Sequence, residues 1–458
     1  MNASVIRLFA LVVVLFAVLV AFTSRWTVFE AQALRENPNN RRVLFEEERI
    51  KRGVIRAQDG TVLAGSRALG NHRYGRRYPL GDLFAHPVGY TSIDRGRTGL
   101  EEFYNDPLTG RRNDAVGALE RLLGPRDVGD DLQTTLDEPA QQVAQQGLGG
   151  RSGAVVALDV ESGAVRVLWA TPSYDPTRPA EAKTFNRATQ GRFPPGSTMK
   201  AVTAAAALDT GRYDPSSTVS GENGKVISGA PLNNFGGQDF GQVDLTTALT
   251  NSVNTVWAEI GEKLGKGVMA DYMRDFGFYE DPPLDYPDDQ MVPSGEYIGD
   301  RVLKPTSDRI DVGRMAIGQD KLLVTPLQMA TVAQTIGNGG VRMEPRLVES
   351  ILDPDGRTID EPLPKEAQRV ISADSAAQLG DMMRNVVREG TGTAAALGGV
   401  EVAGKTGTAE LGDGSDDLWF IGFTDKAAVA VVVERVTGGS GGTVAAPIAK
   451  QVLEALGS

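Results

Sequence analysis

The chain has 458 residues and 41% hydrophobic content, enough for about two to four domains with packed cores. It carries 47 Lys and Arg against 59 Asp and Glu, so its net charge of -12 argues against a nucleic-acid partner. The absence of Cys excludes thiol nucleophiles, disulfides and iron-sulfur or zinc-thiolate sites. With only two His in the chain, a three-His metal site is impossible and a Ser-His-Asp triad has few possible members.

An apolar run near the N-terminus predicts a membrane helix. Residues 8–22 are apolar without a break, and with their neighbours they reach the roughly 20 residues that span a bilayer. A cleaved signal peptide is the alternative, but the run is long for one and the nearest A-x-A string, residues 31–33, lies well past it. We therefore expect residues 1–26 to form a short tail and a single anchor. Arginines on both flanks leave its orientation open.

The next segment, residues 27–130, has the composition of a small extended module. It is rich in Arg, Gly, Asn and Asp, and short strand-like runs such as residues 53–63 are separated by turn signals. We expect a mostly β module here, called the pedestal below.

From residue 131 to residue 458 the pattern changes to long apolar segments, which predict a larger domain. Five strands are predicted at residues 154–160, 164–170, 400–406, 418–423 and 427–436. Helices are predicted at residues 197–208, 251–263, 326–336, 373–388 and 446–456. Because the strands come from the two ends of this region, we expect one five-stranded antiparallel sheet flanked by helices, with a helical subdomain between. The fold class is α/β of the α+β type.

Two motif matches lack the structural context that their chemistry needs. Residues 399–406 fit the P-loop string, but the strand-like residues lie between its glycines and no helix is expected to start at Lys405. Residues 438–442 fit the G-x-S-x-G nucleophile elbow, but no His follows Ser440. We therefore expect neither a nucleotide site nor a hydrolase elbow, and we assign Ser440 to a flexible glycine loop.

Without Cys and with so little His, the expected nucleophile is a serine activated by lysine. Ser197 and Lys200 supply that pair at the start of a predicted helix, where a spacing of three residues puts both on one face. The helix N-terminus also favours negative charge at the serine. Taken alone, this pair would more often be a capping Ser beside a solvated Lys.

Two further motifs follow in a fixed order. Ser252 and Asn254 form an S-x-N motif at the start of another predicted helix, and residues 405–408 read K-T-G-T on a predicted strand. Each alone would be an ordinary cap or strand edge. The order S-x-x-K, S-x-N, K-T-G, with each motif on the required element, matches the signature of penicillin-binding proteins and serine β-lactamases.

The whole chain resembles the class B penicillin-binding proteins, which are membrane-anchored peptidoglycan D,D-transpeptidases. Beyond the three motifs, the resemblance rests on residues 52–64, 99–101, 108–110, 171–176, 316–319, 324–330, 418–423 and 446–448. Residues 89–92, with the small pedestal, are most similar to the penicillin-binding protein A branch of actinobacteria. One departure is Arg-Ala-Gln at residues 56–58, where the family usually has an Asp-Arg pair. The resemblance implies a serine β-lactamase/transpeptidase-like fold.

The resemblance also implies catalytic roles for four side chains. Ser197 would attack the penultimate D-Ala of a stem peptide and form an acyl-enzyme, and Lys200 would take the Ser197 proton. Burial and the charge of Lys405 would lower the pKa of Lys200 for this task. Ser252 would relay a proton to the leaving amine.

Substrate binding is implied for the rest of the motifs. Asn254 would hold the substrate amide, while Lys405, Thr406 and Thr408 would bind the terminal carboxylate. Gly407 would let the substrate backbone lie beside the strand. The backbone N–H groups of Ser197 and Thr408 would form the oxyanion hole. No cofactor and no metal are expected.

Several rival functions share these motifs. A class A bifunctional protein would need a glycosyltransferase domain before residue 131, for which there is no room. A β-lactamase would need a group that activates a deacylating water, and no Glu-x-x-Leu-Asn string lies between Ser252 and Lys405. A D,D-carboxypeptidase and a non-catalytic β-lactam sensor or scaffold remain as alternatives.

The resemblance further implies partners and location. Stem peptides and β-lactams are the expected ligands, and a membrane glycosyltransferase of the shape, elongation, division and sporulation family is the expected protein partner. The expected location is the bacterial cell membrane, with a single pass, a cytoplasmic tail and an extracytoplasmic catalytic domain.

Overall fold

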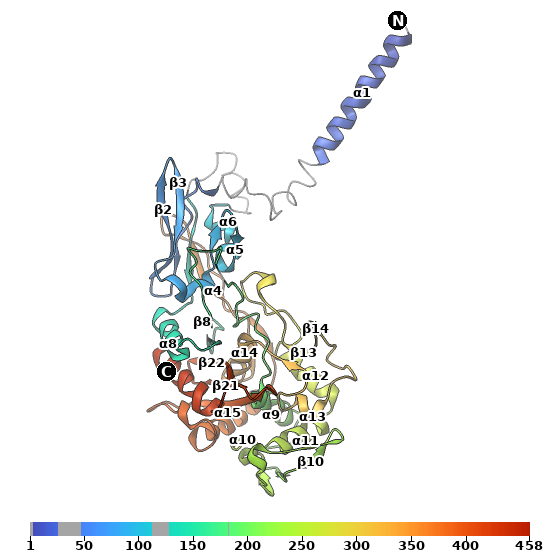
Figure 1. Ribbon diagram of the computed structural model, residues 1–458, viewed down its shortest axis with the longest axis vertical. Helices are drawn as coiled ribbons and strands as arrows, with labels where there is room; N and C mark the ends of the chain where they lie inside the picture. The colour runs from blue at the N-terminus through green and yellow to red at the C-terminus, as the bar shows by residue number, and fades with distance from the viewer. Residues whose placement is uncertain (1–2, 26–46, 112–127, 182) are drawn as a thin grey trace.

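The computed structural model describes residues 3–25, 47–111, 128–181 and 183–458. Helix α1 (Ala3–Ser24) has 22 residues, none of them buried, and it stands at one end of the molecule (Figure 1). Within the described ranges it is the one helix long and apolar enough to cross a membrane. The predicted boundary at residue 26 falls outside the described residues.

The centre of the molecule is a five-stranded antiparallel sheet in the order β20-β21-β22-β7-β8. Its strands are β7 (Gly153–Asp159), β8 (Val165–Thr171), β20 (Ala403–Glu410), β21 (Asp416–Phe423) and β22 (Ala427–Val436). Residues 428–433 of β22 are fully buried. Such a continuous apolar run is typical of a strand covered on both faces. The predicted sheet is confirmed.

Helices cover both faces of this sheet. Helices α8 (Glu138–Leu148) and α16 (Ala446–Ala455) pack together on one face, and α14 (Pro326–Gly337) and α15 (Ala373–Arg388) pack together on the other. Helix α14 begins where the Thr325 side chain accepts a hydrogen bond from the Gln328 N–H, with a proline in the first turn.

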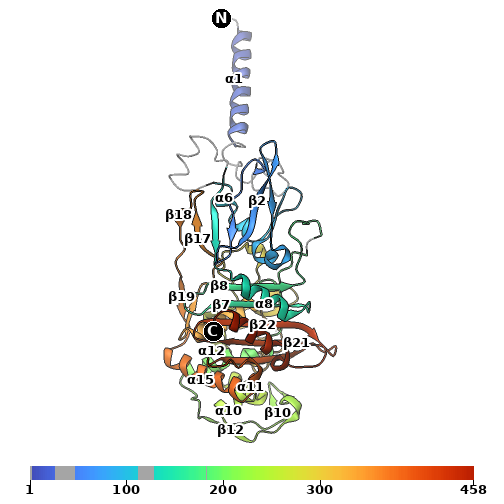
Figure 2. The same cartoon turned by 90° about the vertical axis from the view of Figure 1, so that its left-hand side faces the viewer.

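A helical subdomain lies at the end of the molecule opposite α1 (Figures 1 and 2). It contains η3 (Gly196–Met199), α9 (Lys200–Asp209), α10 (Leu245–Thr250), α11 (Asn254–Leu264), α12 (Lys266–Asp275) and α13 (Val312–Met315). Short 3-10 turns lie at η4 (Phe235–Gly237) and η5 (Asp288–Gln290).

The pedestal carries a second sheet, in the order β18-β17-β6-β1-β2-β3. Its strands are β1 (Ile55–Arg56), β2 (Val62–Gly70), β3 (Arg73–Arg77), β6 (Asp131–Thr134), β17 (Val348–Leu352) and β18 (Thr358–Asp360). Short helices beside it are η2 (Gly81–Phe84), α4 (Ala85–Val88), α5 (Gly99–Phe103) and α6 (Asn105–Leu108). The β17–β18 hairpin comes from the C-terminal half of the chain, which the sequence did not predict. The domain boundary at residue 130 stays a prediction.

The remaining strands form short ribbons. They are β4 (Thr91–Ser92), β5 (Gly96–Arg97), β9 (Thr218–Ser220), β10 (Lys225–Ile227), β11 (Ala230–Leu232), β12 (Gln242–Asp244), β13 (Gly295–Ile298), β14 (Arg301–Val302), β15 (Leu322–Leu323), β16 (Val341–Met343) and β19 (Glu366–Arg369). Two short turns, η6 (Thr393–Ala395) and η7 (Gly441–Ala445), complete the elements.

Some predicted bounds were wrong. The strand predicted at residues 400–406 begins at Ala403 and runs to Glu410. The strand-like run at residues 53–63 holds only the two-residue β1 and the start of β2. The helix predicted from residue 251 begins at Asn254, because Ser252 adopts a left-handed backbone conformation with φ of 57°.

Candidate active site

Ser197 lies where the helical subdomain meets the edge of the central sheet. It stands in the 3-10 turn η3, directly before α9, and its side chain is partly buried. The turn packs against β20, the edge strand of the sheet. Among the described residues, the Ser197 hydroxyl has no hydrogen-bond partner. The predicted pairing of Ser197 with Lys200 on a regular helix is therefore modified: a 3-10 turn carries the serine, and α9 begins at the lysine.

Three of the motif side chains meet at one hydroxyl group. Lys200 Nζ lies 3.2 Å from Ser252 Oγ, and Lys405 Nζ lies 2.9 Å from the same atom. Lys200 also donates to the Ser252 carbonyl oxygen at 2.7 Å and to Asn254 Oδ1 at 2.6 Å. The three sequence motifs, far apart in the chain, thus converge on Ser252.

Both lysines are fully buried, and this changes their acidity. Burial lowers the pKa of Lys200 well below its usual range, and the positive charge of Lys405 lowers it further. Burial also lowers the pKa of Lys405 to about 7. A lysine held this way can lose its proton near neutral pH, which a general base requires.

The strained backbone at Ser252 explains its position. Its φ of 57° is unusual for a residue other than glycine and costs about 1–3 kcal/mol. This conformation ends α10 and turns the chain so that Asn254 starts α11. The turn therefore brings the side chains of Ser252 and Asn254 to the same ammonium group.

The K-T-G-T residues lie on β20, facing η3. A side-chain carbon added to Gly407 would lie 2.7 Å from the Pro195 carbonyl oxygen, so only glycine lets the strand approach the turn this closely. The Thr406 hydroxyl lies 2.6 Å from the Thr391 hydroxyl, and Thr408 is partly buried. The same close packing places Thr408 beside Gly196, whose added side-chain carbon would lie 2.9 Å from the Thr408 carbonyl oxygen.

Several residues that support the site were missed by the sequence analysis. Asn234 is buried, and its Oδ1 accepts hydrogen bonds from the Thr255 N–H at 3.0 Å and the Thr255 hydroxyl at 3.2 Å, which fixes the start of α11. The Trp419 indole donates to the Pro194 carbonyl oxygen at 3.0 Å. Gly-Thr-Gly-Thr at residues 390–393 is an unusual small-residue string that could have drawn attention to Thr391.

The two rejected motifs lack the local structure that their chemistry requires. Residues 403–406 of the P-loop string lie within β20, and no helix begins at Lys405. The Ser440 side chain caps the turn η7 by accepting a hydrogen bond from the Thr443 N–H. The next residue, Gly441, packs against the Gly407 and Trp419 backbone. The segment is therefore an ordered capping turn and not only a glycine loop.

No group of three or more His, Asp and Glu that could hold a metal occurs in the part of the chain described by the structure.

Two family models match this chain. The penicillin binding protein transpeptidase domain matches residues 153–454, which include all three motifs. The penicillin binding protein A dimerisation domain matches residues 52–126.

Individual proteins match over the full length. The peptidoglycan D,D-transpeptidase PbpA of Mycolicibacterium smegmatis is 34% identical and covers 99% of each chain. The same-named protein of Mycobacterium tuberculosis is 33% identical, again over 99% of each chain. The ceftriaxone acyl-enzyme structure of penicillin-binding protein A from M. tuberculosis has a TM-score of 0.80 at 32% identity and covers 90% of this chain and 99% of its own. This chain therefore belongs to the class B penicillin-binding proteins and is a serine-type peptidoglycan D,D-transpeptidase of cell-wall synthesis.

Proposed function

We propose that Ser197 is the nucleophile of this transpeptidase. Its Oγ attacks the carbonyl carbon of the penultimate D-Ala of a stem peptide, and the bond to the nitrogen of the terminal D-Ala breaks. The donor peptide is then held as an ester, and D-Ala leaves. The observation that carries this proposal is the convergence of two buried lysines on the Ser252 hydroxyl, because one of them, Lys200, lies one turn after Ser197 along the chain. Penicillin-binding protein A of M. tuberculosis forms acyl-enzymes with β-lactams, which supports the same chemistry here.

Lys200 is the general base in this proposal. Its lowered pKa supports a neutral amine that accepts the Ser197 proton during attack. The Ser252 oxygen accepts hydrogen bonds from both lysines, so both of its acceptor positions are occupied. Its own proton is then free to be donated to the leaving nitrogen, and Lys200 replaces that proton.

The substrate lies between β20 and the S-x-N turn. Lys405, Thr406 and Thr408 bind the terminal carboxylate, while Gly407 leaves room for the substrate backbone along the edge strand. Asn254 has its Oδ1 on Lys200 and its Nδ2 on the Asn233 carbonyl oxygen, and it turns to the substrate amide when Lys200 moves to Ser197.

The oxyanion hole consists of the backbone N–H groups of Ser197 and Thr408. The close packing of Gly196 on Thr408 supports this assignment, since it brings the two backbones together.

The second half of the reaction regenerates the enzyme. An amine of a neighbouring stem peptide attacks the ester carbon, the bond to Ser197 Oγ breaks, and a cross-link forms. A D,D-carboxypeptidase would use water instead, and a sensor or scaffold would form no product.

Mass spectrometry of the products distinguishes these outcomes. The full chain is incubated with a stem pentapeptide ending in D-Ala-D-Ala and with an acceptor peptide that carries a free amine. We expect cross-linked dimer and free D-Ala from the parent and from Ser440→Ala, and neither from Ser197→Ala. Release of D-Ala with tetrapeptide only would establish a carboxypeptidase, and no product at all from a folded parent would refute the proposal.

We also propose that α1 is a single-pass anchor in the bacterial cell membrane, with residues 1–26 as tail and anchor and the catalytic domain outside. The substrate is available only outside the cytoplasmic membrane, which supports this orientation. The chain has no Cys, so Val226→Cys introduces one reactive thiol. This residue lies in β10, at the end of the molecule opposite α1 (Figure 1). A membrane-impermeant maleimide should label it on intact cells, and protection until lysis would contradict the orientation.

A division into residues 27–130 and 131–458 is the proposed domain organisation. The two family models fall on either side of residue 130, which supports it. By the resemblance, the anchor and pedestal would contact a glycosyltransferase of the shape, elongation, division and sporulation family. Co-purification of that enzyme with the full chain, and its loss when residues 47–111 are deleted, is the expected result.

A further inference from the structure

The outer face of the β2–β3 hairpin is strongly basic. Strands β2 and β3 pair with Gly65 opposite Arg77 and Arg67 opposite Gly75. Directly paired residues share a face of a sheet, so these four lie on one side. Side-chain carbons added to Gly65 and Gly75 would lie 3.4 Å from Arg77 Nε and 3.1 Å from Leu69 Cδ1. The side chains of Arg77 and Leu69 therefore lie across the glycines of this face.

The charge of this face is mostly uncompensated. Alternation along β3 adds Arg73 to the same side, and its nearest acid is Glu48, at 3.5 Å from a side chain that is itself 52% exposed. Arg67 and Arg77 are exposed and have no ion pair among the described residues. No Asp or Glu occurs in residues 62–77, although the whole chain has a net charge of -12. The hairpin is thus a basic surface on an acidic protein.

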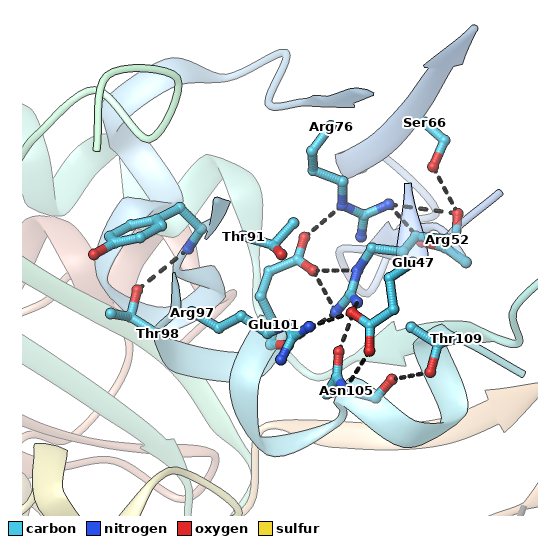
Figure 3. Close-up of polar contacts among 12 residues, drawn as sticks. Glu47, Arg52, Ser66, Arg76, Thr91, Arg97, Thr98, Glu101, Asn105 and Thr109 are labelled. Atoms are coloured by element: carbon cyan, nitrogen blue, oxygen red, sulfur yellow. Dashed lines mark hydrogen bonds and ion pairs between the residues drawn. The ribbon is translucent and has the colours of Figure 1, made fainter. Parts of the chain in front are cut away.

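The opposite face of the hairpin is held firmly in the pedestal (Figure 3). Arg76 points inward, where it donates to Glu101 Oε1 at 2.5 Å and to the Gly53 carbonyl oxygen at 2.7 Å. Arg52 donates to Glu101 Oε2 at 3.0 Å, and Glu101 is fully buried. These contacts neutralise the inner arginine and fix the direction in which the outer ones point.

The hairpin tip lies at the end of the molecule that carries α1. Figures 1 and 2 show the tip directed toward that end, while the helical subdomain occupies the other end. The turn between the strands presents exposed Asn71 and His72, and Leu69 is exposed beside them. A hairpin with a basic face and an exposed leucine therefore points its tip toward the end of the molecule that carries α1.

We propose that the outer face of the β2–β3 hairpin, formed by Arg67, Leu69, Arg73 and Arg77, binds the phosphate groups of anionic lipids. Guanidinium groups suit phosphate oxygens because they donate paired hydrogen bonds in a planar fork. Leucine beside them can enter the headgroup boundary, as apolar side chains do in interfacial segments. This contact rests on the proposed membrane orientation of α1. It sets the height and tilt of the pedestal above the bilayer.

A fluorescent label at the hairpin tests the contact. Because the chain has no Cys, Leu69→Cys provides a single attachment site, and Val226→Cys at the far end provides a matched exposed apolar control. The full chain is placed in nanodiscs of phosphatidylcholine alone or with phosphatidylglycerol, each with a quencher on the lipid headgroup. We expect strong quenching at position 69 only in anionic discs, and none at position 226.

Charge removal provides the second arm. Arg67→Gln with Arg77→Gln in the Leu69→Cys chain should reduce the ratio of bound to free hairpin about fivefold for each arginine. Salt at 1 M should have a similar effect, because it shortens the screening length from about 10 Å to about 3 Å. Penicillin acylation of each variant shows, independently of the quenching signal, that the chain is folded and that Ser197 reacts.

Two results would overturn the proposal. One is equal quenching at position 69 in neutral and anionic discs. The other is unchanged quenching in the double glutamine variant. If these arginines only keep an edge strand from self-association, the variant would aggregate without any change in quenching.

Discussion

At the scale of single residues, the site depends on how two buried lysines share hydrogen-bond acceptors. Lys200 donates to Asn254 Oδ1 at 2.6 Å, and it has no carboxylate partner among the described residues. A neutral amide therefore occupies the place where an acidic side chain would stabilise the ammonium form. No acidic side chain therefore offsets burial and the charge of Lys405, which together lower the Lys200 pKa as a base near neutral pH requires.

The pH dependence of acylation tests this reasoning. Only neutral Lys200 accepts the serine proton, so the acylation rate should rise with pH through the lowered pKa and then level off. Asn254→Asp places a negative charge beside Lys200, which raises its pKa and shifts the rise to higher pH. We expect acylation by benzylpenicillin to be roughly tenfold slower or more at pH 7 and to recover partly at pH 9. Stopped-flow acylation gives both profiles, and unshifted profiles would argue against Lys200 as the base.

At the scale of elements, the serine turn is held by close backbone packing. Gly318 has φ of 78°, and a side-chain carbon there would lie 1.9 Å from the Gly196 carbonyl oxygen. The Gly196 N–H in turn donates to the Gly318 carbonyl oxygen at 3.0 Å. The turn that carries Ser197 is thus packed between Gly318 on one side and β20 on the other.

Gly318→Ala should displace this turn. We expect acylation to fall about 100-fold, because a shift of about 1 Å in a reacting group has that effect. Gly241→Ala is the matched control, since Gly241 also has positive φ, at 59°, but no atom within 4 Å of an added carbon. The control should lose only about 1–2 kcal/mol of unfolding free energy. Normal acylation in Gly318→Ala would show that the packing does not position Ser197.

A second element joins the pedestal to the catalytic region. Asp285 accepts hydrogen bonds from the Leu347 N–H at 2.6 Å, the Val348 N–H at 2.9 Å and the Tyr104 hydroxyl at 2.9 Å. Burial raises its pKa to about 6 despite these donors. Its folded pKa thus exceeds the unfolded value of about 3.9, so the contribution of this group to stability falls as pH rises from about 4 to 6.

Asp285→Asn should weaken this junction. The carboxylate accepts hydrogen bonds on both oxygens, whereas the amide has one acceptor oxygen and turns its NH2 group toward a backbone N–H. We therefore expect the free energy of unfolding to fall by about 1–3 kcal/mol at pH 7. Asp289→Asn, on an exposed neighbour, should change stability by less than about 0.5 kcal/mol. Denaturant unfolding at pH 7 compares the two. Equal values would mean that the Asp285 hydrogen bonds contribute little.

At the scale of the whole molecule, the pedestal sheet is built from both halves of the chain. Strand β6 pairs with β1 on one side and with β17 on the other. The Gln290 side chain accepts a hydrogen bond from the Gly99 N–H and donates one to Glu102, both in α5. Its carbonyl oxygen accepts a hydrogen bond from the Thr189 hydroxyl, which lies in the segment before the serine turn. Pedestal and catalytic region therefore share both strands and side-chain contacts.

Removal of the pedestal should destabilise what remains. A fragment of residues 131–458 exposes the edge of β6 and leaves Asp285 without Tyr104. We expect its melting temperature to lie about 5 °C or more below that of a form containing residues 47–458, with a greater tendency to aggregate. Calorimetry of both forms tests this, and equal melting temperatures would show that the catalytic region is independent.

The sequence predicted the parts of this molecule that local patterns determine. Five apolar strands, the long apolar N-terminal helix and the three motifs follow from periodicity, run length and spacing. The convergence of Lys200 and Lys405 on Ser252 agrees with the expected grouping. Their buried environment agrees with the expected low pKa of Lys200.

The missed features all depend on contacts between distant segments. The β17–β18 hairpin carries no sign that it joins the pedestal, since its pairing with β6 spans more than half of the catalytic region. The left-handed conformation at Ser252 occurs without a glycine, so the residue type did not indicate it. In the sequence, Asn234 cannot be distinguished from other turn asparagines. Its role follows only from its hydrogen bond with Thr255 at the start of α11.

The central claim is that Ser197 is the acylated nucleophile, and intact-protein mass spectrometry tests it most directly. A soluble form without the anchor is incubated with benzylpenicillin beside Ser197→Ala. We predict a stable adduct of one β-lactam on the parent and none on the variant. An adduct on Ser197→Ala, or none on a folded parent, would contradict the account.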